Sequence, residues 1–131
     1  MEITEREHIA KEVLPGRALQ RAIGENSKFP SGFMTVGYAT YDVSSGLMEP
    51  HHHAEETVVI FDVKDGYVGW GPDQGHMTQW VKLKKGMVLH IPENEWHVFT
   101  YEPGGFVDII FIYGTARNIR PEDNPGSKES R

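Results

Sequence analysis

Short runs of β-branched and aromatic residues recur along most of the chain, and each run is bounded by Gly, Pro, Asn or Asp. Such runs favour pleated strands because branched and aromatic side chains pack well on a half-buried sheet surface. Turn residues between them stop each strand after a few positions. The pattern predicts strands at 33–43, 57–63, 67–70, 77–83, 87–91, 96–101 and 106–113.

From residue 57 on, five breaks separate these predicted strands, at 64–66, 71–75, 84–86, 92–95 and 102–105. No stretch between them has the 3.6-residue period of an amphipathic helix, and only 2–8 is expected to form a helical turn. Many short strands with frequent turn signals predict an all-β sandwich or barrel.

The chain has 131 residues, which is enough for one domain with one modest core. We expect an N-terminal segment with edge strands at 1–32, a barrel at 33–116 and a mobile C-terminal tail at 117–131. The tail is predicted from its composition, since it combines Pro121, Pro125 and Gly126 with many charges and no aromatic residue.

The composition limits the classes of function that the chain can have. The chain contains no Cys, so any metal must be held by nitrogen and oxygen ligands. The formal net charge is −6, which argues against nucleic-acid binding because phosphate contacts need clustered Lys and Arg. The longest apolar run, 107–113, is too short to span a membrane and contains Asp108, which needs a polar partner if it is buried. With no signal peptide at its start, we expect a cytoplasmic protein.

Histidines supply the candidate chemistry. His51 and His53 are two positions apart, so an extended chain turns both imidazoles to one face and His52 to the other. Glu55 or Glu56 can add a carboxylate, and His97 can reach the same place from a later strand if the sheet closes. Two or three His with one carboxylate suit one divalent transition metal, namely Fe, Mn, Zn, Ni or Cu.

Around these histidines the chain resembles the cupin superfamily, in particular its small single-domain members. The first cupin motif is matched by Gly46, His51, His53, Glu56 and Gly66. The second motif is matched in register by Gly86, Pro92 and His97. The chain departs from the family pattern in the shorter spacing from His53 to Glu56, in Asn94 at a loop position that is usually Gly, and in Tyr101 at a position that is usually Asn.

The resemblance implies a double-stranded β-helix, or jelly-roll barrel, with the metal inside one end and often a dimeric assembly. It implies His51, His53, His97 and Glu56 as metal ligands, although strand parity counted from His53 favours Glu55. Glu55, His90 and Tyr101 are the candidates for a general acid or base.

Three functions remain open at this point. The first is a metal-dependent isomerase, epimerase or lyase that acts on a small polar substrate such as a sugar or keto acid, with the metal as Lewis acid. The second is an Fe(II)-dependent dioxygenase, and the third is a non-catalytic cupin that binds a small ligand. In each case the expected partners are a small molecule and a second copy of the chain, without nucleic acid or membrane.

Overall fold

The computed structural model describes residues 1–117 and 119–120, and in this part of the chain it is almost entirely β. The elements in chain order are η1 (Arg6–His8), β1 (Lys11–Leu14), β2 (Arg17–Gly24), β3 (Phe29–Pro30), β4 (Thr35–Tyr41), η2 (Val43–Ser45), β5 (Glu56–Gly71), β6 (Gln79–Lys82), β7 (Val88–Ile91) and β8 (Trp96–Tyr113). Both helices are single 3-10 turns of three residues. The all-β expectation is confirmed.

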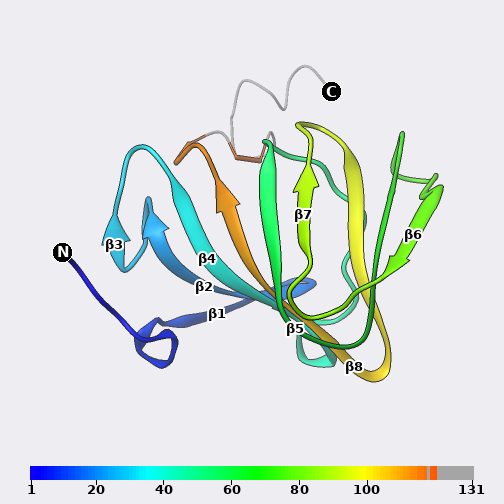
Figure 1. Cartoon of the computed structure of the whole chain (residues 1–131), viewed down its shortest axis with the longest axis horizontal. Coiled ribbons are helices and arrows are strands. Elements are labelled where there is room, and N and C mark those ends of the chain that lie inside the picture. Colours follow the sequence, from blue (N-terminus) through cyan, green and yellow to red (C-terminus); the bar gives the residue numbers. More distant parts are fainter. Residues whose placement is uncertain (118, 121–131) are drawn as a thin grey trace.

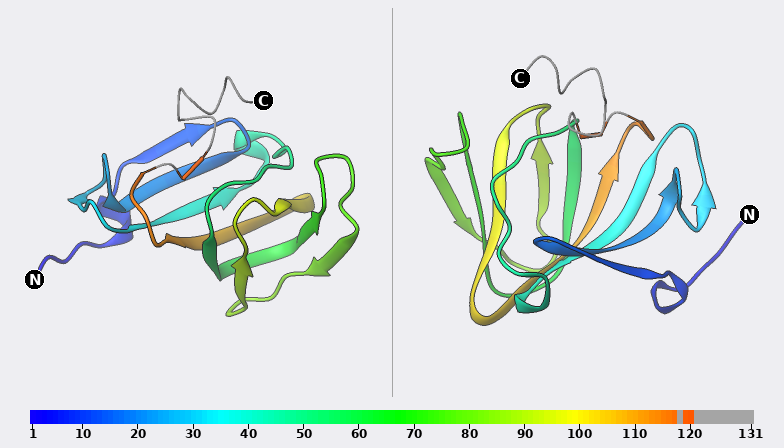
Figure 2. Two further views of the ribbon diagram at one scale, coloured as in Figure 1. Left: turned by 90° about the horizontal axis from the view of Figure 1, so that it is seen from above. Right: turned by 180° about the vertical axis from the view of Figure 1, so that it is seen from behind.

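The strands form one hydrogen-bonded sheet in the order β1-β2-β4-β8-β5-β6, with β3 attached to β2 and β7 attached to β5. All pairings are antiparallel except that of β2 with β3. Figure 1 shows β5 and β8 bending at the lower end of the molecule, so that the two halves of each strand rise on different sides. Both views in Figure 2 show the resulting curl of the sheet.

Two predicted breaks are wrong as strand ends. The segments 64–66 and 102–105 lie inside β5 and β8, which are 16 and 18 residues long. Each break instead becomes an irregularity, because the β5–β8 ladder passes from Lys64 opposite Phe106 to Gly66 opposite Tyr101. Asp65 and Gly104 have positive φ values of 48° and 84° there. The turn residues therefore bend the strands instead of ending them.

Alternate residues of the central strands face the interior. On β5 these are Glu56, Val58 and Ile60, and on β8 Val107 and Ile109 follow the same alternation. The apolar members of these rows form one core together with Phe99 and side chains from β2, β4 and β7. Glu56 is the polar member of the inward row on β5, so the fold itself turns its carboxylate toward the interior.

The N-terminal segment is fastened to the outer side of the sheet through Asp108. Nη1 and Nη2 of Arg6 donate to the two carboxylate oxygens of Asp108 at 2.6 and 2.8 Å, and the Thr40 hydroxyl donates to the same carboxylate at 2.8 Å. The Arg6 guanidinium also lies 4.3 Å from the ring centroid of Tyr38. These contacts supply the polar partner that Asp108 requires.

Of the segment predicted as a mobile tail, residue 118 and residues 121–131 lie outside the described part of the structure. Ile119 packs against the core, and its carbonyl accepts a hydrogen bond of 2.7 Å from the Ala54 N–H. Within 1–117 and 119–120, no helix has the length and apolar character needed to cross a membrane.

Candidate metal centre

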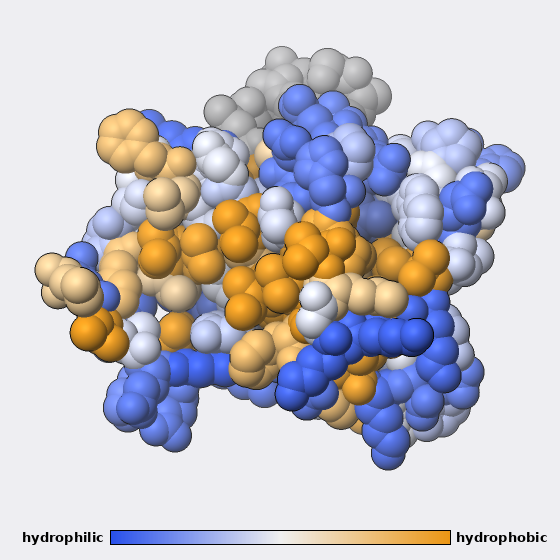
Figure 3. Space-filling view, in the orientation of Figure 1, coloured by the Kyte–Doolittle hydropathy of each residue, from blue (hydrophilic) through white to orange (hydrophobic). Residues whose placement is uncertain are grey.

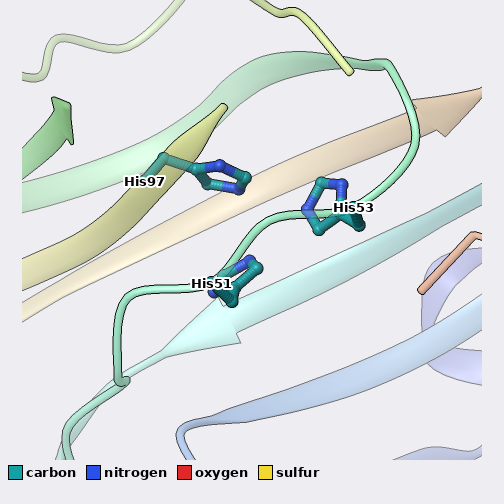
Figure 4. Close-up of side chains that lie close together, drawn as sticks. All are labelled: His51, His53 and His97. Atoms are coloured by element: carbon teal, nitrogen blue, oxygen red, sulfur yellow. The ribbon is translucent and has the colours of Figure 1, made fainter. Parts of the chain in front are cut away.

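Three histidines from two distant segments meet at one end of the sheet. His51 and His53 lie on the chain that leads into β5, and His97 is the second residue of β8. The His51 N–H donates to the His97 carbonyl at 3.0 Å, and the His97 N–H donates back to the His51 carbonyl at 2.9 Å. Figure 4 shows the three rings gathered around a common space. The backbone pair thus holds the two segments of the cluster in register.

The ring nitrogens are arranged as metal ligands would be. Each Nδ1 contacts a backbone carbonyl, of Glu49 for His51, of Ala54 for His53 and of Glu95 for His97, at 3.3, 2.9 and 2.8 Å. Because a carbonyl only accepts, Nδ1 carries the proton and Nε2 keeps its lone pair. One nitrogen from each ring lies within 4.8 Å of the others. Nε2 of His97 is buried and has no hydrogen-bond partner among the residues that the structure describes, which is expected of a metal-ligating nitrogen.

Burial keeps the imidazoles of His51 and His97 neutral. It lowers the pKa of His51 to about 2, helped by the neighbouring His97, and it lowers the pKa of His97 to about 4. His53 and His97 are 2% and 1% exposed. At neutral pH His51 and His97 are therefore in the neutral form, which is the form that binds a metal.

Glu56 is the carboxylate at this cluster. Its Oε1 lies 3.4 Å from Nε2 of His53 and 4.0 Å from Nε2 of His97. Burial raises the pKa of Glu56 to about 7, partly opposed by Tyr113 and by the charge of Arg120. The parity that favoured Glu55 is broken by a bend at Ala54, so that the next residue faces outward and Glu56 faces inward.

The other predicted acid and base residues lie away from the three rings. Glu55 and His90 are exposed and contact each other, with Oε2 2.5 Å from Nε2. The Tyr101 hydroxyl donates to the Gly46 carbonyl at 3.4 Å. His52 stacks edge-on against Trp96, with ring centroids 4.4 Å apart, on the opposite side of its segment from the cluster.

Two buried tyrosines join the site and were missed by the sequence analysis. The Tyr113 hydroxyl lies 3.5 Å from Nε2 of His53, and it interacts with the Glu56 carboxylate. Tyr41 lies on the inward face of β4, and burial raises the pKa of both phenols. In the sequence both are strand-favouring aromatics, and nothing there sets them apart from packing residues.

Two cavities border the three histidines. The first, of about 380 Å³, is bounded by His51, His53 and Glu56 on one side. Charged and hydroxyl side chains from β1, β2 and β4 and from residue 120 form much of the rest of its wall. The second, of about 350 Å³, is bounded by His97 and His90 and otherwise by apolar residues of β5, β6 and β7. The cluster thus contributes to the walls of a polar and an apolar cavity, whose concave shape suits a small ligand.

The chain was compared with known proteins. No family model matches it, and no curated protein matches it. Solved structures do match in three dimensions. The polyketide cyclase RemF from Streptomyces resistomycificus is similar with a TM-score of 0.67 and 19% identity, over 98% of this chain and 96% of RemF.

Two larger proteins share the same arrangement of strands. The DMSP lyase DddQ from Ruegeria pomeroyi DSS-3 has a TM-score of 0.62 and 20% identity, over 79% of this chain and 49% of DddQ. Fe(II)-HppE has a TM-score of 0.63 and 13% identity, over 86% of this chain and 60% of HppE. At these identities the likeness shows the fold alone. The chain therefore has the cupin fold, as the two sequence motifs had indicated.

Proposed function

We propose that this protein is a metal-dependent enzyme that acts on a small polar substrate by isomerisation, epimerisation or elimination. The observation that carries the proposal is the convergence of one nitrogen from each of three imidazoles, whose Nδ1 atoms contact backbone carbonyls, beside the carboxylate of Glu56. His51, His53, His97 and Glu56 would hold one divalent transition metal. When bound, such an ion acts as a Lewis acid that polarises a carbonyl or hydroxyl oxygen.

The protein side chains would handle binding and protons. The buried end of the first cavity keeps bulk water from the substrate, which strengthens every polar contact made there. The Tyr113 hydroxyl interacts with the Glu56 carboxylate and holds its orientation. The exposed Glu55–His90 pair borders the second cavity through His90, and it is the proposed proton donor and acceptor for the part of the substrate that extends past the three histidines into that cavity. Tyr101 borders neither cavity, so its predicted catalytic role has no geometric support.

Metal content tests the site. Protein purified without added nickel should carry up to one divalent transition metal per chain. His97→Ala should lose most of it, because it removes one of the three imidazoles. His52→Ala is the matched control, since His52 lies next to the same ligands but faces Trp96. Equal metal in wild type and His97→Ala, measured by elemental analysis, would exclude the proposed site.

A second candidate is an Fe(II)-dependent dioxygenase, and the structural likeness to Fe(II)-HppE favours it. Ligand number separates the two, because three His and one carboxylate leave fewer open positions than the two-His, one-carboxylate site of oxygenases. An oxygen electrode decides between them once screening of sugars and keto acids finds a substrate. We expect turnover without oxygen uptake, and stoichiometric uptake coupled to product would establish the dioxygenase.

A further inference from the structure

The wall of the first cavity opposite the histidines is formed by β2. Arg17, Leu19 and Arg21 alternate along this strand and all border the cavity. Leu19 belongs to the apolar core, which fixes the inward direction of this row. Gln20, between them, points to the other side and accepts a hydrogen bond of 2.9 Å from Nε of Arg6. Strand alternation therefore aims the two arginines into the cavity that ends at the histidines.

Among the described residues, Arg17 has no acidic partner, in contrast to Arg6, Arg21 and Arg117. Arg21 pairs with Glu12 at 3.1 Å, Arg6 pairs with Asp108, and Arg117 pairs with Glu25 at 2.7 Å. Within the described residues, Arg17 donates a hydrogen bond of 3.2 Å from Nη1 to the Pro15 carbonyl. A guanidinium has five N–H donors, so most of its donors are available to a ligand.

The surroundings of Arg17 make an added anion favourable. Burial lowers its pKa, and the charge of Arg120, which borders the same cavity, lowers it further. Of the two carboxylates that border this cavity, Glu12 is paired with Arg21 and Glu56 lies among the histidines. A partly desolvated cation beside a second cation gains most from a bound negative group.

We propose that Arg17 binds the anionic group of the substrate, a carboxylate or a phosphate, and so directs the rest of the molecule toward the three histidines. The planar guanidinium fork matches the paired oxygens of both groups. The inference deepens the proposed function and rests on it only in treating the bound anion as part of the substrate. It makes the substrate class a small acid or phosphate ester and excludes a neutral sugar.

The test uses full-length, metal-free protein, so that anion binding is measured apart from metal binding. Propionate and inorganic phosphate are titrated while the side-chain Nε–H signals of arginine are followed by nuclear magnetic resonance. Propionamide is the neutral counterpart of propionate. Arg17→Lys identifies the Arg17 signal by its disappearance. Arg117→Gln is the matched control, because it removes one guanidinium that lies outside the cavity.

We expect saturable shifts of the Arg17 signal with at least one of the two anions and none with propionamide. The stronger-binding anion identifies the carboxylate or the phosphate class. Arg17→Gln should weaken binding by about tenfold or more, corresponding to roughly 1.4 kcal/mol, while Arg117→Gln should bind as wild type does.

Binding of equal affinity in Arg17→Gln, or the absence of a saturable shift at millimolar anion, would overturn the proposal. If Arg17→Gln does not fold, the wild-type Arg17 signal decides alone. Loss of metal from His97→Ala is independent of this result, so the metal proposal and the anion proposal can fail separately.

Discussion

At the scale of single residues, the hydrogen bonds of the imidazoles are the main functional signal. Three backbone carbonyls accept from the three Nδ1 atoms. These contacts select the tautomer in which each Nε2 carries a lone pair that can ligate a metal ion. The rings are packed closely, with centroids 4.4 to 5.0 Å apart. The ring packing and the tautomer thus preorganise the three imidazoles for metal binding.

The two neighbouring glutamates give a prediction at this scale. Glu56→Gln should weaken metal affinity by about 10- to 100-fold, because its Oε1 lies beside Nε2 of His53 and His97. Glu55→Gln should leave the affinity close to that of wild type, since Glu55 is exposed and contacts His90. Metal titration of both variants checks this. A larger loss in Glu55→Gln would contradict the assignment of the ligand.

Acid should destabilise the metal-free protein. The pKa of His97 is lowered from 6.5 to about 4 and that of His51 to about 2. Below pH 6.5 these two side chains are therefore protonated in the unfolded chain but still neutral in the folded chain. Their contribution is complete above pH 6.5 and declines as the pH falls toward those values. The pKa of Glu56 is raised from 4.5 to about 7, and this has the opposite effect on stability. The cost of burying its ionised carboxylate grows as the pH rises through that range.

Two histidines outweigh one glutamate, so the net loss near pH 5 should be about 2 kcal/mol relative to neutral pH. Urea unfolding at the two pH values measures it. Glu56→Gln should make the acid loss steeper by removing the opposing contribution. A stability that is unchanged or higher at the acid pH would show that the histidines titrate normally in the folded chain.

At the scale of the elements, β5 and β8 place the site. Because both strands are long and bent, Glu56 at the start of β5 and Tyr113 at the end of β8 are directly paired, while His97 lies at the other end of β8. The bends bring both ends of β8 to the cluster. A strand that ended at 102–105 would leave these groups on separate elements without a fixed register.

The N-terminal turn η1 is predicted to contribute through one ion pair. Arg6→Ala should lower the free energy of unfolding by about 2 kcal/mol, because it leaves the buried Asp108 carboxylate without its charged partner. Arg117→Ala, which breaks the exposed pair with Glu25, should cost roughly 0–1 kcal/mol. Urea unfolding of both variants measures the difference. Equal losses would show that the Arg6 contact behaves as a surface pair.

At the scale of the whole molecule, two surface features favour association with another copy of the chain: an edge strand and an exposed apolar surface. β1 is at the end of the sheet order and pairs only with β2 among the described strands, which leaves one edge available. Figure 3 shows apolar side chains gathered over the middle of the face that Figure 1 presents. Phe61, Val88 and Ile112, on β5, β7 and β8, are 45%, 68% and 37% exposed.

We therefore predict a homodimer, as the sequence analysis does. The segment before residue 33 is the expected route of association, through addition of its strands to a neighbouring copy. Light scattering at micromolar concentration should give about twice the monomer mass of 14.8 kDa. A mass equal to that of the monomer would refute the prediction.

The sequence by itself determined the fold class and the ligand types. Period-two runs and turn residues were enough for an all-β chain, and the lack of Cys left imidazole and carboxylate as metal donors. The spacing of Gly86, Pro92 and His97 indicated the cupin fold that the solved structures bear out. The φ of 65° at Asn94 agrees with its place at a loop position that is usually Gly.

Tertiary structure decided which side chains share the site. The bend at Ala54 reverses the parity that sequence counting carried forward from His53, so Glu56 reaches the cluster and Glu55 does not. Arg17 and Tyr113 are nearly a hundred residues apart in numbering, and only the pairing of β2, β4 and β8 brings both to one cavity. The local sequence pattern determines which side chains lie on each face of a strand. Register and bending determine which other side chains those faces contact.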